Sequence, residues 1–155
     1  MAADVLVLGI GNTLLSDEGV GVRLAQALAE GPLPDGVRVV DGGTIGLALL
    51  PLVQDAGAVL VLDAARLDAE PGTVRLFEAG AFDAFVAGRR ATPHDVGLGD
   101  LVSALRLSGT MPPRRALLAV QPLSVGLGAE LSEPVAAALV HARAAALALL
   151  ERWTL

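Results

Sequence analysis

Residues 5–22 read Val-Leu-Val-Leu-Gly-Ile-Gly-Asn-Thr-Leu-Leu-Ser-Asp-Glu-Gly-Val-Gly-Val, and the remaining fold can be worked out from them. The first four residues form an apolar run without alternation, which is typical of a central strand covered on both faces in a parallel sheet. Gly9 and Gly11 close the run, and two adjacent acids, Asp17 and Glu18, follow. We therefore expect a strand, a glycine turn and a helix in that order.

The same alternation of apolar strands and helices continues along the chain, which predicts an α/β fold with right-handed crossovers. We expect a three-layer sandwich in which a mostly parallel, twisted sheet of about five strands has helices on both faces. One domain should span residues 1–155. Expected strands cover residues 5–8, 37–40, 59–62, 73–78 and 116–120, and expected helices follow Gly19 and cover residues 46–53, 96–108 and the segment after Ser132.

Three segments carry more specific expectations. Residues 73–78 alternate enough to form a half-exposed strand, and that strand would lie antiparallel at an edge of the sheet. Residues 79–93 show no clear period, so we expect a loop in which Phe82 and Phe85 pin the segment down or contact a partner. Ser132 should cap the last helix, because a proline follows just inside it.

The composition excludes several classes of protein. The net charge is −6, no lysine is present, and the arginines are scattered apart from short pairs such as Arg89-Arg90. Binding to nucleic acid needs clustered basic side chains, and so does docking on an anionic membrane. The chain contains no cysteine, which excludes disulfides, a thiol nucleophile and thiolate ligands.

The hydropathy pattern predicts a soluble protein of the cytoplasm. The first residues lack the basic and apolar regions of a secretory signal. The most apolar long segment, residues 135–150, is interrupted by His141 and Arg143, and a transmembrane helix needs roughly 18 uninterrupted apolar residues. Because no long apolar patch demands a second copy, we expect a monomer.

Several potential metal ligands follow the expected strands. Asp17 and Glu18 come after the first strand, Asp41 after the second and Asp63 after the third, while His94 follows in the long loop. Ligands bind beyond the carboxyl ends of the strands in an open parallel sheet. Carboxylates and an imidazole there could form a divalent transition-metal site. Taken singly, each acid also fits a helix cap or a solvated turn.

A nucleotide site is the alternative interpretation of the opening. Gly9 and Gly11 supply two glycines of the dinucleotide motif G-x-G-x-x-G, and Asp41 would suit a ribose hydroxyl. However, Leu14 stands where the third glycine belongs, and the two acids would lie near the pyrophosphate. A Rossmann-like oxidoreductase therefore remains a rival hypothesis.

Four spaced segments are similar to those of one known family. They are Gly9-Ile-Gly-Asn-Thr-Leu-Leu-Ser-Asp-Glu-Gly-Val-Gly21, Asp41-Gly-Gly-Thr-Ile-Gly46, Asp63-Ala, and Pro93-His-Asp-Val-Gly-Leu-Gly-Asp-Leu-Val-Ser-Ala-Leu105. The sequence thereby resembles the hydrogenase maturation proteases, endopeptidases that trim the C-terminus of the large subunit of nickel–iron hydrogenases.

The resemblance implies a site and a substrate. The family's metal ligands fall on Glu18, Asp63 and His94, and Asp41 falls on an acid that bears on substrate or cleavage-site recognition. The nickel would belong to the precursor of the large subunit, although another divalent metal could occupy the site in the isolated protein. The metal could activate the scissile carbonyl or a water beside Asp41 or Asp17, or it could only dock the substrate. A nickel-binding chaperone without catalytic activity is a third hypothesis.

Overall fold

The computed structural model describes residues 4–44, 46–89 and 98–155. Its sheet has the strand order β2-β1-β3-β5-β4. All neighbouring strands are parallel except β4, which pairs antiparallel with β5 at one edge. The predicted α/β class, mostly parallel sheet and antiparallel edge strand are therefore confirmed. The strands are β1 (Val5–Ile10), β2 (Val37–Gly43), β3 (Ala58–Ala64), β4 (Val74–Glu78) and β5 (Arg114–Val120).

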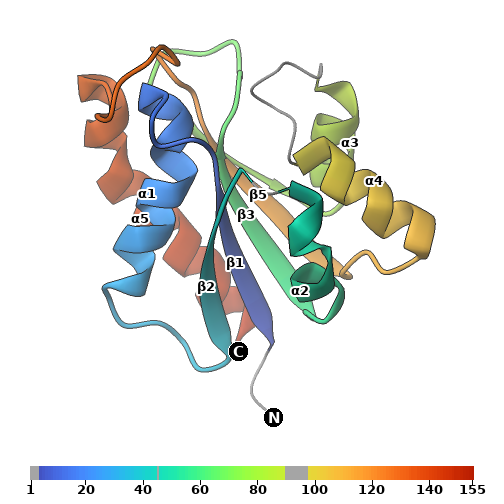
Figure 1. Cartoon of the computed structure of the whole chain (residues 1–155). Helices are drawn as coiled ribbons and strands as arrows, with labels where there is room; N and C mark the ends of the chain where they lie inside the picture. Colours follow the sequence, from blue (N-terminus) through green and yellow to red (C-terminus); the bar gives the residue numbers. More distant parts are fainter. Residues whose placement is uncertain (1–3, 45, 90–97) are drawn as a thin grey trace.

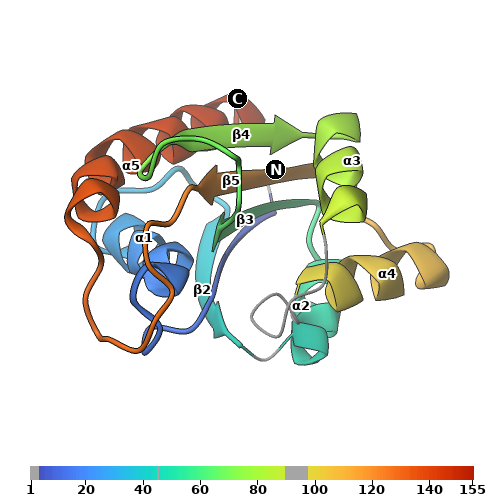
Figure 2. The same cartoon turned by 90° about the horizontal axis from the view of Figure 1, so that it is seen from above.

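Helices cover both faces of the sheet, as Figures 1 and 2 show. On one face lie α1 (Val20–Ala29) and α5 (Glu133–Trp153). On the other lie α2 (Leu50–Gln54), α3 (Gly80–Gly88) and α4 (Leu98–Ser108). Two short 3-10 helices, η1 (Ser16–Gly19) and η2 (Gly46–Leu49), lead into α1 and α2.

Alternate residues of β1 enter different cores, which explains its unbroken apolar run. Val5 and Val7 belong to the core under α1 and α5, whereas Leu6 and Leu8 belong to the core under α2, α3 and α4. Every residue of β1 is buried. A central strand with helices on both faces needs apolar side chains at each position.

The expected loop over residues 79–93 is wrong for its first part, because residues 80–88 form α3. Phe82 and Val86 lie one helical turn apart and are both buried in the core. Phe85 stacks on Phe77 with ring centroids 4.3 Å apart. Two apolar anchors on one face outweigh the weak local pattern, since packing stabilises most protein helices. Residues 90–93 lie outside the described part of the chain.

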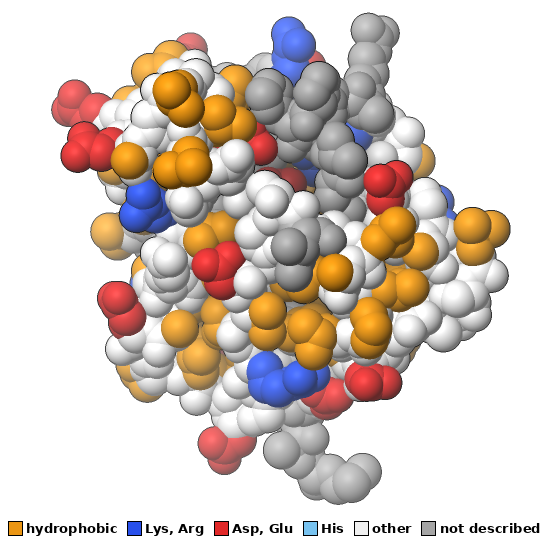
Figure 3. All heavy atoms as spheres, in the orientation of Figure 1, with side chains coloured by type: hydrophobic (Ala, Val, Ile, Leu, Met, Phe, Trp, Pro, Cys, Tyr) orange, Lys and Arg blue, Asp and Glu red, His pale blue; other side chains and the backbone are white. Residues whose placement is uncertain are grey.

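The last helix, α5, is long and apolar enough to cross a membrane by length and composition alone. Its stripe of Val135, Ala142, Ala146 and Leu149 is buried against the sheet, so in this fold the helix is part of a packed core. Basic side chains are scattered over the face shown in Figure 3 and form no large cluster among the residues coloured there.

Candidate active site

Two glycines of the opening segment bring η1 and α1 against the ends of the strands. Gly11 has a φ of +133°, and a side chain there would collide with the carbonyl oxygen of Glu18. A side chain at Gly21 would collide with the carbonyl oxygen of Leu62 on β3. The chain can therefore turn sharply after β1 and seat the start of α1 on β3.

This turn places Glu18 next to the strand that carries Asp63. Glu18 lies in η1, which packs against β3, and it is only 8% exposed. Asp63 lies near the carboxyl end of β3, and its side chain is 12% exposed. Two carboxylates shielded from water at one edge attract a cation more strongly than exposed acids do, because the local dielectric constant is low.

The third predicted ligand, His94, lies outside the described residues. Over residues 4–44, 46–89 and 98–155, no group of three or more histidine and acidic side chains is arranged to hold a metal ion. Glu18 and Asp63 are the two predicted ligands that lie among the described residues. Carboxylates are suitable donors for divalent cations, and a neighbouring imidazole would extend the set toward nickel.

Asp17 has a structural position rather than one in the site. Its side chain is fully buried and accepts hydrogen bonds from the segment that follows β5. The backbone N–H groups of Leu123 and Ser124 donate to Oδ2 at 2.9 and 3.0 Å. The backbone N–H of Ser132 donates to Oδ1 at 2.7 Å, and its hydroxyl donates to Oδ2 at 2.7 Å.

These bonds keep Asp17 ionised. Burial alone raises the pKa of Asp17, but the hydrogen bonds from Ser124, Ser132 and Leu123 outweigh it, so the pKa lies below its usual 3.8. A carboxylate with four donors and a lowered pKa is a poor proton acceptor near neutral pH. Of the two carboxylates considered as a base, Asp17 is therefore the less suitable.

Ser132 occupies the N-cap position of α5, as predicted, but its side chain makes no cap hydrogen bond to the helix. Its hydroxyl serves Asp17 instead. Further bonds fix the same segment beside η1: the Ser16 hydroxyl donates to the Gly126 carbonyl at 2.7 Å, and Arg23 donates to the Ala129 carbonyl at 2.6 Å. These bonds fix residues 121–132 to η1 and to α1. Asp17, which accepts four of them, is the residue next to Glu18.

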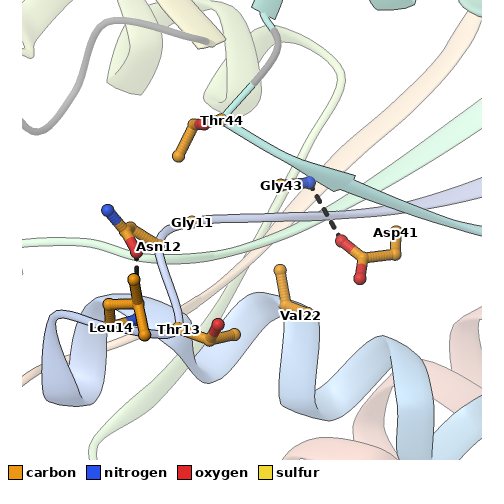
Figure 4. Close-up of a pocket in the computed structure, with 8 residues that line it drawn as sticks. All are labelled: Gly11, Asn12, Thr13, Leu14, Val22, Asp41, Gly43 and Thr44. Atoms are coloured by element: carbon orange, nitrogen blue, oxygen red, sulfur yellow. Dashed lines mark hydrogen bonds between the residues drawn. The ribbon is translucent and has the colours of Figure 1, made fainter. Parts of the chain in front are cut away.

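Asp41 lies at the end of β2, in a pocket of about 410 Å³ (Figure 4). The side chain is exposed, and its Oδ1 accepts a 3.0 Å hydrogen bond from the Gly43 N–H. Asp41 is the only charged side chain among the described residues that line this pocket. Strand β1 separates β2 from β3, so Asp41 and Asp63 are on strands about 10 Å apart. This placement suits contact with a bound segment better than proton transfer beside Asp63. The lining residues are Gly11, Asn12, Thr13, Leu14, Val22, Asp41, Gly43 and Thr44.

Sequence reasoning missed one charged residue of the site. Arg89, at the end of α3, places Nη1 3.4 Å from Oδ2 of Asp63. The sequence held only a weak signal for this contact, a pair of arginines shortly before His94. The link between Asp17 and Ser132 was also missed, since 115 positions separate the two residues.

The fold and the sequence both match one class of protein. Residues 22–149 match the family model described as hydrogenase maturation protease. Over 149 residues the chain is 40% identical to the hydrogenase expression/formation protein HupM of Azotobacter chroococcum mcd 1, covering 95% of this chain and 71% of the relative. It is 39% identical over 124 residues to the hydrogenase 2 maturation protease of Escherichia coli K12, covering 78% and 74%.

A solved structure agrees with these relatives. The hydrogenase maturating endopeptidase HybD from Escherichia coli superposes with a TM-score of 0.87 at 36% identity, covering 96% of this chain and 92% of that chain. The chain belongs to the hydrogenase maturation protease family. It is an endopeptidase with a soluble fold of the HybD type, and the comparisons do not favour the oxidoreductase or the chaperone.

Proposed function

We propose that the protein removes a short C-terminal peptide from the nickel-loaded large-subunit precursor of a nickel–iron hydrogenase. The observation that supports this site most directly is the burial of Glu18 and Asp63 on elements that pack against each other. Nickel enters as part of the substrate, and Glu18, Asp63 and His94 engage it. The carboxylates hold the precursor's metal centre so that the adjoining C-terminal segment lies across the sheet edge.

The reaction is hydrolysis of one peptide bond. The oxygen of water attacks the scissile carbonyl carbon, the C–N bond breaks, and the water proton goes to the departing amine. A nickel ion bound at the site would supply electrophilic assistance at the carbonyl or at water. Asp41 contacts the substrate segment next to the cleavage point. Its pocket is open to solvent, so a bound segment can reach it, and the Gly43 N–H orients its carboxylate.

The direct test mixes the pure protein with nickel-loaded and nickel-free precursor and detects the released peptide by mass spectrometry. We expect cleavage of the loaded precursor alone. Glu18→Gln, Asp63→Asn and His94→Ala should each lower the single-turnover rate on the order of 100-fold or more, since each removes a ligand. Glu130→Gln is the control, because Glu130 is an exposed acid on the segment fixed to η1. Undiminished cleavage by all three site variants would refute the assignment, and binding of nickel-loaded precursor without cleavage would favour the chaperone.

A second measurement separates the roles of Asp41. Asp41→Asn should raise KM for the precursor more than it lowers kcat, because the pocket contributes binding. A fall in kcat with unchanged KM would instead assign Asp41 to water activation. We further propose that the protein works as a monomer in the cytoplasm, which light scattering after gel filtration and cell fractionation would test.

A further inference from the structure

Asp63 has a charged neighbour within its own chain. Nη1 of Arg89 lies 3.4 Å from Oδ2 of Asp63, and the two side chains are only 14% and 12% exposed. Water therefore screens this pair much less than it screens the surface pairs of the protein, such as Arg66 and Asp68, whose side chains are 88% and 86% exposed.

The position of Arg89 is fixed by the end of α3. Its backbone N–H bonds to the Val86 carbonyl, which closes the helix. Its guanidinium lies 6.0 Å from the centroid of the Phe85 ring, and that ring stacks on Phe77 of β4. The aromatic pair anchors α3 to the edge strand β4, and this packing keeps the Arg89 guanidinium close to Asp63.

A cation at this position competes with any other cation for the same carboxylate. Free divalent metal ions would be attracted to Glu18 and Asp63, and a bound free ion would block the site. A guanidinium close to Asp63 opposes this binding in two ways, by neutralising the carboxylate and by repelling the incoming ion.

We propose that Arg89 is a specificity-determining residue: it is a resident counter-ion of Asp63 that suppresses binding of free divalent metal and gives way to nickel presented by the precursor. This inference rests on the proposed function, because it takes Asp63 as a residue that engages nickel. A precursor held by its other contacts presents its metal at a high effective concentration, and this allows it to displace the guanidinium where a dilute free ion cannot.

The test is calorimetric titration of Cd²⁺ into the metal-free protein. Arg89→Gln should bind Cd²⁺ about tenfold more tightly than the parent protein, the effect of removing one close opposing charge from a shielded site. Arg89→Lys should restore weak binding, since it retains the cation. Arg66→Gln is the matched control: it removes one positive charge from an exposed position soon after β3 and should leave the affinity unchanged.

A second readout uses the reaction itself. Micromolar Cd²⁺ should inhibit precursor processing by Arg89→Gln while leaving the parent protein active, and a chelator should reverse the inhibition. Equal Cd²⁺ affinity of Arg89→Gln and the parent, together with weakened binding in Asp63→Asn, would overturn the role of Arg89 while leaving the proposed site intact. If Asp63→Asn processes the loaded precursor normally and Arg89→Gln binds no Cd²⁺, both the inference and the proposed site are wrong.

Discussion

Replacing Asp17 with Asn should destabilise the protein strongly, although the two side chains have nearly the same size. The carboxylate accepts one backbone hydrogen bond at Oδ1, and two backbone bonds and one hydroxyl bond at Oδ2. An asparagine can keep its oxygen on the Oδ2 side, but its NH₂ group then faces the Ser132 N–H. The partly buried Ser132 N–H loses its acceptor, and the remaining bonds lose their charge assistance.

The magnitude follows from these contacts. A buried donor without an acceptor costs about 1–3 kcal/mol, and the loss of charge assistance adds about 1 kcal/mol more. We therefore expect the free energy of unfolding to fall by about 3 kcal/mol, which lowers the melting temperature by roughly 6–12 °C for a chain of this size.

Thermal and urea denaturation at pH 7 measure the loss directly. Amide hydrogen exchange should locate it, with faster exchange at Leu123, Ser124 and Ser132 and little change in β1. Glu130→Gln, an exposed acid in the same segment, should melt within about 1 °C of the parent protein. A melting temperature of Asp17→Asn within 2 °C of the parent would refute the role of this carboxylate as the anchor of the segment.

Three further outcomes follow from the packing and the charges. Gly21→Ala should lower the free energy of unfolding by about 1–3 kcal/mol in a urea experiment, because the new Cβ collides with a β3 carbonyl despite the better helix propensity of alanine. Gly80→Ala is the control, since its Cβ meets nothing within 4 Å and the free energy of unfolding should not fall. Arg115→Gln should lower stability by about 1 kcal/mol in the same assay, since it breaks a partly buried bidentate pair with Asp83 at 2.6 and 2.8 Å; a larger loss in 1 M salt than in low salt would contradict this. The pKa of Asp83 is lowered by its hydrogen bond to Arg115, and the pKa of Asp17 is also lowered. Both carboxylates therefore stabilise the folded protein at pH values above their usual pKa of 3.8, and this stabilisation is lost as the pH falls through their pKa values in the folded protein. Acid titration followed by circular dichroism should therefore show a shallower loss of stability below pH 4 for Asp17→Asn than for the parent.

Much of the fold could be read from the order of residues along the chain. The unbroken apolar runs identified the buried parallel strands, because a central strand has no solvent-facing side. Alternation identified β4 as the half-exposed edge strand. Local patterns failed at α3, whose helix depends on the burial of Phe82 and Val86 against distant parts of the chain.

In the candidate site, too, one part could be predicted from the sequence and another part could not. The spacing of acids after the strands predicted Glu18 and Asp63 at one edge, since parallel strands end on the same side of a sheet. The position of the acids after the strand did not separate Asp17 from Glu18, and only the family resemblance assigned the ligand role to Glu18. Packing makes that distinction, because the Asp17 carboxylate accepts hydrogen bonds from donors more than 100 positions away and thereby anchors the segment after β5.

The sequence thus specifies which residue types reach the edge of the sheet, because strand periodicity and glycine turns are local properties of the chain. Their separate tasks arise only in the folded protein. The Asp17 carboxylate accepts four hydrogen bonds, stays ionised and becomes an anchor, whereas Asp63 is shielded from water and paired with Arg89. Burial, hydrogen bonding and charge pairing all depend on segments distant in the sequence, and no local pattern encodes them.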